Sequence, residues 1–171
     1  MESLEEKLSK AIEFVRQSFL DSKINLDYSI SSVRHFDNLF DTEFKKGKLR
    51  NSNGGFAQHQ GIIMAGVAGY IAEVITKNTS NSAISFDEKD ENWSVNFTVT
   101  SENGWTIQPG IRVMKRAYNG KEDELYAYVV STIKYFNQPK SDSADNNRYI
   151  QEVHLRDIGE NIGQKPWWKF W

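Results

Sequence analysis

The sequence predicts an α+β fold in which several helices pack on a small antiparallel sheet. Apolar residues recur every three or four positions over long stretches, which is the period of a buried helix face. Residues 93–100 instead alternate strictly between apolar and polar side chains, as a strand with one solvent-facing side does. Asn103 and Gly104 follow this stretch and predict a tight hairpin turn. Helical stretches on both sides of a strand region favour the mixed class.

Two helices are predicted at the N-terminus. The first spans residues 2–21, and its apolar stripe consists of Leu4, Leu8, Ile12, Val15 and Phe19. The second runs from a break at residues 27–29 to about residue 44, and its stripe consists of Val33, Phe36, Phe40 and Phe44. Residues 45–55 are polar and contain glycine, so they are predicted to form a loop.

A third helix, predicted over residues 56–77, is rich in glycine and alanine and is expected to be the centre of the fold. Small residues recur on one of its faces at Gly61, Ala65, Gly69 and Ala72. A face almost free of side chains allows another element to approach closely. Because each glycine inside a helix costs up to about 1 kcal/mol relative to alanine, tight packing is the compensation that we expect.

The sheet is expected to have two to four strands, because a pair of strands alone is marginally stable. Residues 93–100 and a strand that begins at Trp105 form the predicted hairpin, and residues 83–86 are a candidate third strand. Two further helices follow. One starts at Pro109, which suits the first turn of a helix. The other spans residues 122–137 and ends before Pro139.

Residues 1–138 are therefore predicted to form a single domain, and residues 139–171 a linker followed by a tryptophan-rich C-terminal tail. The chain has no cysteine and no basic, apolar leader at its start, so we expect a cytoplasmic protein. The longest membrane-like stretch, residues 61–72, falls short of the ~20 residues that a transmembrane segment needs. A net charge of −2 argues against nucleic acid as a partner.

No catalytic or metal-binding motif emerges from the spacing of the reactive residues. The histidines, His35, His59 and His154, are far apart in the sequence, and there is no cysteine to complete a metal site with them. No nucleophile elbow and no complete phosphate-binding loop is present. We therefore expect no catalytic residue, no metal and no cofactor, and the sequence favours a protein that is not an enzyme.

One polar cluster on the third predicted helix is a candidate site. His59 and Glu73 are separated by two spacings of seven, and Tyr70 precedes Glu73 by three, so the three fall near one stripe. Glu73 follows an apolar run, and a buried carboxylate requires a cation or several hydrogen-bond donors. Lys115 and Arg116 are the expected partners. The pattern favours a structural ion pair; the alternative is a cleft in which Glu73, His59 and Arg116 bind a small ligand or act as acid and base.

The C-terminal tail has an unusual aromatic composition. It contains Trp167, Trp168, Phe170 and Trp171, which include three of the five tryptophans of the chain. Exposed aromatic clusters of this density are uncommon on monomers. Three interpretations remain open. The tail docks on the protein's own surface, or it inserts into a second copy or a partner protein, as tryptophan does at binding hot spots, or it contacts a membrane surface.

A family resemblance is carried by four segments of the middle of the chain: residues 66–75, with Tyr70 and Glu73 in a Gly-x-Tyr-x-x-Glu-Val pattern, and residues 92–93, 107–109 and 113–116. With these segments, residues 54–136 resemble bacterial families of unknown function, of which domain of unknown function 3806 is one. The resemblance implies no established activity. It places Glu73, Lys115 and Arg116 in the family pattern and leaves the N-terminal helices and the tail outside it.

These observations lead to a functional hypothesis. We expect a non-enzymatic protein-interaction module, for example an immunity-type partner of a toxin, that binds a protein partner or a second copy through its C-terminal tail. The alternative is a small-molecule-binding protein or modest enzyme with a cleft around Glu73, His59 and Arg116.

Overall fold

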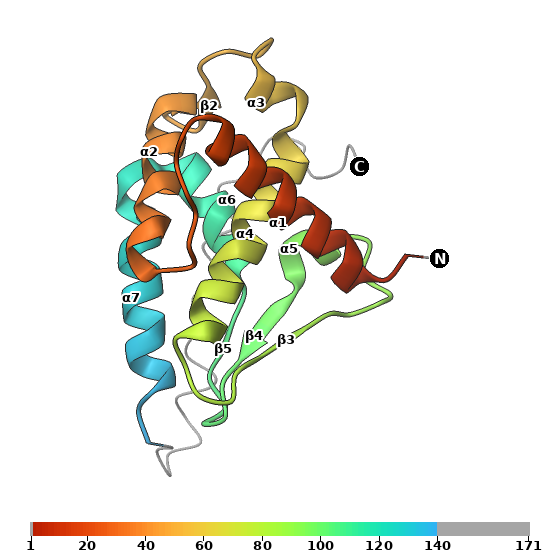
Figure 1. Cartoon of the computed structure of the whole chain (residues 1–171), viewed down its shortest axis with the longest axis vertical. Helices are drawn as coiled ribbons and strands as arrows, with labels where there is room; N and C mark the ends of the chain where they lie inside the picture. The colour runs from red at the N-terminus through yellow and green to blue at the C-terminus, as the bar shows by residue number, and fades with distance from the viewer. Residues whose placement is uncertain (1, 140–171) are drawn as a thin grey trace.

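Helix α4 (Gln60–Lys77) lies at the centre of the fold because nearly its whole circumference is apolar, and residues 64 to 72 are all buried. The computed structural model describes residues 2–139. In Figure 1, α1 (Leu4–Asp21) crosses in front of α4, while α2 (Arg34–Glu43) and α7 (Leu125–Phe136) lie on one side of it. The strands of the larger sheet lie on the other side. The predicted α+β class is confirmed.

Helix α1 packs directly against the small residues of α4. Ser3 caps α1 through a capping box with Glu6, and the predicted apolar stripe buries Leu8, Ile12 and Val15. The close approach that the sequence predicted on α4 occurs at Gly69, and a still closer contact occurs at Gly66, which lies outside the predicted face. A Cβ atom at Gly66 would lie 2.2 Å from the carbonyl oxygen of Ala11, so only glycine fits there.

The second predicted helix is present in two parts, a 3₁₀ turn η1 (Ile30–Val33), capped by Ser29, and α2. The loop predicted after it contains a minimal hairpin of β1 (Phe44–Lys45) and β2 (Lys48–Leu49), which the sequence did not indicate. Lys46 and Gly47 form its turn, both with positive φ angles, of 50° and 73°. The predicted third helix is interrupted: α3 (Gly55–Gln58) ends at His59, whose φ and ψ of −121° and 19° separate it from α4.

The larger sheet is antiparallel, as predicted, and its three strands lie in the order β3-β4-β5. They are β3 (Ala83–Ser85), β4 (Thr98–Thr100) and β5 (Thr106–Ile107). The strand predicted over residues 93–100 is wrong in its first half, where α5 (Trp93–Asn96) forms a helical turn. The Asp90 carboxylate accepts hydrogen bonds from the Asn92 backbone N–H and the Asn96 amide, both at 2.7 Å, and these local bonds favour the turn.

Helix α6 (Pro109–Asn119) begins at Pro109 as predicted, and its buried residues include Ile111, Val113 and Met114. The last predicted helix begins later than expected, because residues before it form a 3₁₀ turn, η2 (Gly120–Asp123), and α7 starts at Leu125. No helix within residues 2–139 is both long and apolar enough to cross a membrane. The predicted linker and aromatic tail, apart from Pro139, lie outside the described residues.

Substitution of Gly66 by alanine tests the contact between α1 and α4. The added methyl group would overlap the Ala11 carbonyl and the Val15 side chain, so we expect the free energy of unfolding to fall by about 2–3 kcal/mol. The control is Gly55→Ala in α3, where a Cβ meets nothing within 4 Å and where alanine should leave the stability unchanged or raise it. Urea denaturation measures both. Equal stability of the two variants would contradict the packing described for α1.

Candidate functional site

A groove lies between the C-terminal half of α1 and the outer side of α2. It encloses a volume of about 340 Å³, which is at the lower end of the range for ligand pockets. Its floor is apolar and is supplied by four separate segments of the chain: α1, the turn after it, α2 and α4. We call this site the α1–α2 groove; its lining residues are Val15, Ser18, Phe19, Ser22, Ile24, His35, Asn38, Leu39, Thr42 and Ile63.

The turn at the end of α1 shapes one wall of this groove. Lys23 adopts the left-handed conformation, with φ of 63°, and its N–H donates to the Leu20 carbonyl at 2.8 Å. The next residue, Ile24, donates to the Phe19 carbonyl at 2.9 Å, so the chain folds back over the helix end. The Phe19 ring is held edge-on against the buried Phe36 of α2, with 5.3 Å between ring centroids. The wall is therefore fixed from both helices.

The rim of the groove is polar, but most of its hydroxyl groups are already used as donors. The hydroxyls of Ser18, Ser22 and Thr42 donate to backbone carbonyls one turn earlier in their own helices, at 2.8, 3.4 and 2.9 Å. The imidazole of His35 and the side-chain amide of Asn38 make no hydrogen bond within residues 2–139. These two side chains lie one turn apart on α2. The groove thus combines an apolar floor with two available donors.

A second, smaller pocket of about 210 Å³ lies between α1, α4 and α5. Its apolar lining residues are Ala11, Ile62, Ala65 and Trp93. The exposed and oppositely charged Lys7 and Glu91 line it as well. Burying an apolar group here would also desolvate these charges, which is unfavourable.

Tyr70 and Glu73 lie together, in a cluster with residues from the loop before α2. The Tyr70 hydroxyl accepts from the Tyr28 backbone N–H at 2.7 Å and bonds the Ser32 hydroxyl at 2.8 Å. Its ring stacks on that of Tyr28, with 4.7 Å between centroids. Burial raises the pKa of Tyr28, and the negative charge of Glu73 adds to the effect. The cluster anchors the loop to α4.

The predicted ion pair between Glu73 and Lys115 or Arg116 is wrong. The Glu73 side chain is 29% exposed, and its carboxylate pairs with the Lys77 ammonium, one turn later on α4, at 2.7 Å. Because the carboxylate is at the surface, it needs no partner from α6. Lys115 lies on α6 and is partly buried. His59 is exposed at the break before α4, with its ring centroid 5.5 Å from that of Phe14. Of the five predicted residues, Tyr70 and Glu73 share the Tyr28 cluster, whereas His59 lies at the break before α4 and Lys115 and Arg116 lie on α6. Neither pocket described above is lined by any of the five.

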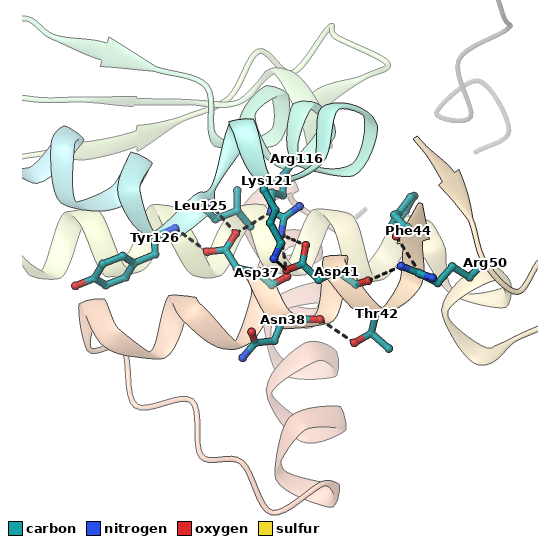
Figure 2. Close-up of polar contacts among 10 residues, drawn as sticks. All are labelled: Asp37, Asn38, Asp41, Thr42, Phe44, Arg50, Arg116, Lys121, Leu125 and Tyr126. Carbon is teal, nitrogen blue, oxygen red and sulfur yellow. Dashed lines mark hydrogen bonds and ion pairs between the residues drawn. The ribbon is translucent and has the colours of Figure 1, made fainter. Parts of the chain in front are cut away.

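Arg116 is instead buried in a network that joins α2, α6 and the start of α7 (Figure 2). Its side chain is 2% exposed, and its Nε donates to the Asp37 carboxylate at 2.9 Å. Its Nη2 donates to the Asp37 carbonyl at 3.0 Å and to the Asp41 carboxylate at 2.6 Å. The same Asp37 carboxylate accepts from the backbone N–H groups of Leu125 and Tyr126, each at 2.9 Å. Both oxygens of this buried carboxylate therefore accept hydrogen bonds.

The importance of Asp37 was visible in the sequence and was missed. Asp37 follows Val33 by four residues and precedes Phe40 by three, so it occupies a position on the apolar stripe of α2. A charged residue at such a position is buried, and a buried charge requires partners. The sequence feature that indicates a buried ion pair is therefore the Asp37 carboxylate, and not that of Glu73.

Comparison of the sequence and the fold with protein families, curated proteins and solved structures finds no match. The resemblance of residues 54–136 to bacterial families of unknown function accordingly stays a prediction. Within residues 2–139, no group of three or more histidine, aspartate or glutamate side chains is placed to hold a metal ion.

Removal of the Arg116 side chain tests the buried network. Arg116→Ala leaves the Asp37 carboxylate buried without its cation, so we expect the free energy of unfolding to fall by about 3–5 kcal/mol. The matched control is Lys77→Ala, which removes the cation of the surface pair with Glu73 and should cost less than about 1 kcal/mol. Chemical denaturation of both variants measures the difference. Similar losses in the two would show that the network contributes no more than a surface ion pair.

The pH dependence of stability tests the position of Asp41 in this network. The hydrogen bond from Arg116 holds the pKa of the Asp41 carboxyl below its usual value of 3.8. The carboxylate therefore stabilises the fold fully above about pH 5, where it is ionised in both states, and this contribution is lost as the pH falls through the usual pKa of 3.8 and below it. The difference in unfolding free energy between the unaltered chain and Asp41→Asn should be constant from neutral pH to about pH 5 and shrink below about pH 4. A difference that is unchanged at low pH would contradict the assignment.

Proposed function

We propose that this protein is a non-enzymatic protein-interaction module and that the α1–α2 groove receives an apolar side chain of the bound peptide segment. The observation that carries this proposal is the combination of an apolar floor of about 340 Å³ with the unused donors of His35 and Asn38. A peptide supplies a partner for each of these features. Its apolar side chains fit the floor, and its backbone carbonyls accept hydrogen bonds from the donors. An immunity-type partner protein is one form that such a module takes.

The chemistry of the groove favours binding over catalysis. His35 is the one side chain among the lining residues of a type that commonly serves as a catalytic base. A catalytic base is normally oriented by a hydrogen bond to a further group. The described contact of the His35 ring is with the Phe19 ring, at 6.4 Å between centroids, which positions the ring without orienting its protons. The role that this geometry leaves for the His35 imidazole is to donate a hydrogen bond to an acceptor on a bound segment.

The alternative, a small-molecule site or modest enzyme around Glu73, His59 and Arg116, has no observation in its favour. Arg116 is enclosed by Asp37 and Asp41. Glu73 pairs with Lys77 at the surface, and His59 is at the other end of α4. The distances along α4 alone keep these side chains from acting on one ligand, because His59 and Glu73 are about 20 Å apart at 1.5 Å of rise per residue.

Binding of N-acetyl-tryptophanamide, followed through the methyl signals of Ile24, Leu39 and Ile63 by NMR, tests this proposal. We expect saturable shifts with a dissociation constant of roughly 0.1–1 mM, the range for a ligand of this size. The titration is performed on the full chain and on a full-length variant, named the alanine-tail variant, in which Trp167, Trp168, Phe170 and Trp171 are all alanine.

Two exposed serines of α1 provide a matched pair of variants for the titration. Ser18 lines the groove, whereas Ser9 is nine residues earlier, about two and a half helical turns, and faces the opposite side of α1. Ser18→Arg should abolish the methyl shifts, and Ser9→Arg should leave them intact. Absence of saturable shifts in the alanine-tail variant, or equal shifts in both arginine variants, would overturn the proposal.

A further inference from the structure

We infer that the second pocket, between α1, α4 and α5, binds a free α-amino acid with an apolar side chain. Such a ligand carries an ammonium and a carboxylate beside one apolar group. The pocket and the α1–α2 groove share no lining residue, so this inference is independent of the proposed function. It has three supports, namely the unpaired charges of the pocket, its unused hydrogen-bonding groups, and its volume.

The pocket brings together a cation and an anion that are not paired. Lys7 comes from α1 and Glu91 from the loop before α5, and neither side chain makes an ion pair or a hydrogen bond within residues 2–139. Lys10, three residues after Lys7 on α1, does pair, with Glu2 at 2.7 Å. A ligand with a carboxylate and an ammonium pairs with both side chains, and its charges replace the water that they lose. The desolvation that opposes an uncharged apolar ligand is therefore compensated for an amino acid.

Two further polar side chains that line this pocket are unused. The amide of Asn92 and the hydroxyl of Ser94 are partly buried, and neither makes a hydrogen bond to another described residue. The hydroxyls that line the α1–α2 groove, in contrast, donate to carbonyls of their own helices. A carboxylate has about four acceptor positions on its two oxygens. It accordingly accepts from the Asn92 amide, the Ser94 hydroxyl and the Lys7 ammonium together.

The remaining lining residues are apolar and are positioned by helix packing. Ala11 belongs to α1 and Ala65 to α4, and these helices approach so closely that a Cβ atom at Gly66 would lie 2.2 Å from the Ala11 carbonyl oxygen. Ile62 and Trp93 complete the apolar lining. The side chain of the amino acid buries its apolar surface against these groups, which adds a favourable term to the pairing of the charges.

The volume of about 210 Å³ limits the size of the ligand. A cavity of about 150 Å³ holds one benzene molecule, whereas drug-sized ligands occupy pockets of about 300–1,000 Å³. A single amino acid with a branched aliphatic or a phenyl side chain falls between these limits. The pocket is thus matched to one amino acid and is too small for a longer peptide.

Titration of the full chain with L-phenylalanine, followed by NMR, tests the inference. The Trp93 indole N–H and the methyl signals of Ala11 and Ile62 report on the pocket, and those of Ile24 and Leu39 report separately on the α1–α2 groove. We expect saturable shifts of the pocket signals with a dissociation constant of roughly 1–10 mM, the range for a ligand of this size.

Substitutions of the two charged residues test how the ligand is recognised. Glu91→Gln should weaken binding of L-phenylalanine about fivefold to tenfold, but should not weaken binding of 3-phenylpropionate, which has no ammonium. Lys7→Met should weaken binding of L-phenylalanine by a similar factor, but should not weaken binding of phenethylamine, which has no carboxylate. The matched controls are Glu88→Gln and Lys10→Met, which alter a nearby carboxylate and a nearby ammonium outside the pocket and should leave the dissociation constant unchanged.

Three outcomes would overturn the inference. The first is the absence of saturable shifts of the pocket signals at L-phenylalanine concentrations above the expected dissociation constant, including the case in which only the groove signals move. The second is equally tight binding of N-acetyl-phenylalaninamide, which has the same apolar side chain and no charge. The third is equal affinity for L-phenylalanine in Glu91→Gln and Glu88→Gln, or in Lys7→Met and Lys10→Met. None of these results changes the expected binding of N-acetyl-tryptophanamide in the α1–α2 groove.

Discussion

The burial of the Asp37 carboxylate determines how α2, α6 and α7 lie relative to one another. Moving a carboxylate from water into the protein costs several kcal/mol unless donors replace its hydration. The Arg116 side chain and the Leu125 and Tyr126 backbone N–H groups supply those donors, and they come from two different helices. If either helix moved away, part of the compensation would be lost, so the three helices are held as a unit. In Figure 2, Asp37 and Asp41 lie on one side of α2, and the groove residues Asn38 and Thr42 lie on the other.

The position of α1 depends on a constraint of a different kind. Gly66 and Gly69 remove the side chains that would keep α1 away from α4, and the two helices approach until the Ala11 carbonyl is in contact with the α4 backbone face. The α1 wall of the groove is thus positioned by close packing, and the α2 wall by the buried Asp37 carboxylate. Packing of apolar surface depends weakly on pH, whereas the pairing of carboxylates is lost in acid. Acid should therefore weaken the pairing of Asp41 with Arg116, which joins α2 to α6, before it affects the packing of α1 on α4.

Much of the fold follows from sequence patterns that act over short distances. The apolar stripe of α1, the start of α6 at Pro109 and the small antiparallel sheet all depend on residues close together in the chain, and all were predicted. The strand predicted at Trp93 was wrong because Asp90, outside the alternating stretch, stabilises a helical turn through its side chain. The pairing of Glu73 with Arg116 was wrong because Arg116 has a better-placed carboxylate, 79 residues earlier in the chain. The groove itself was not predictable from the sequence. It is assembled from four segments, and the sequence of each segment, taken alone, is that of an ordinary helix or turn.

The loop between α1 and α2 affects the entropy cost of binding at the groove. Tyr28 holds a left-handed backbone conformation, with φ of 61°, which is unfavourable for a bulky side chain by about 1–3 kcal/mol. Its N–H bond to Tyr70 and the stacking of the two rings compensate for that strain. A loop held in this way has already lost its conformational entropy when the protein folds. The groove that it borders is therefore preorganised, and a segment that enters it loses only its own freedom rather than that of the site as well.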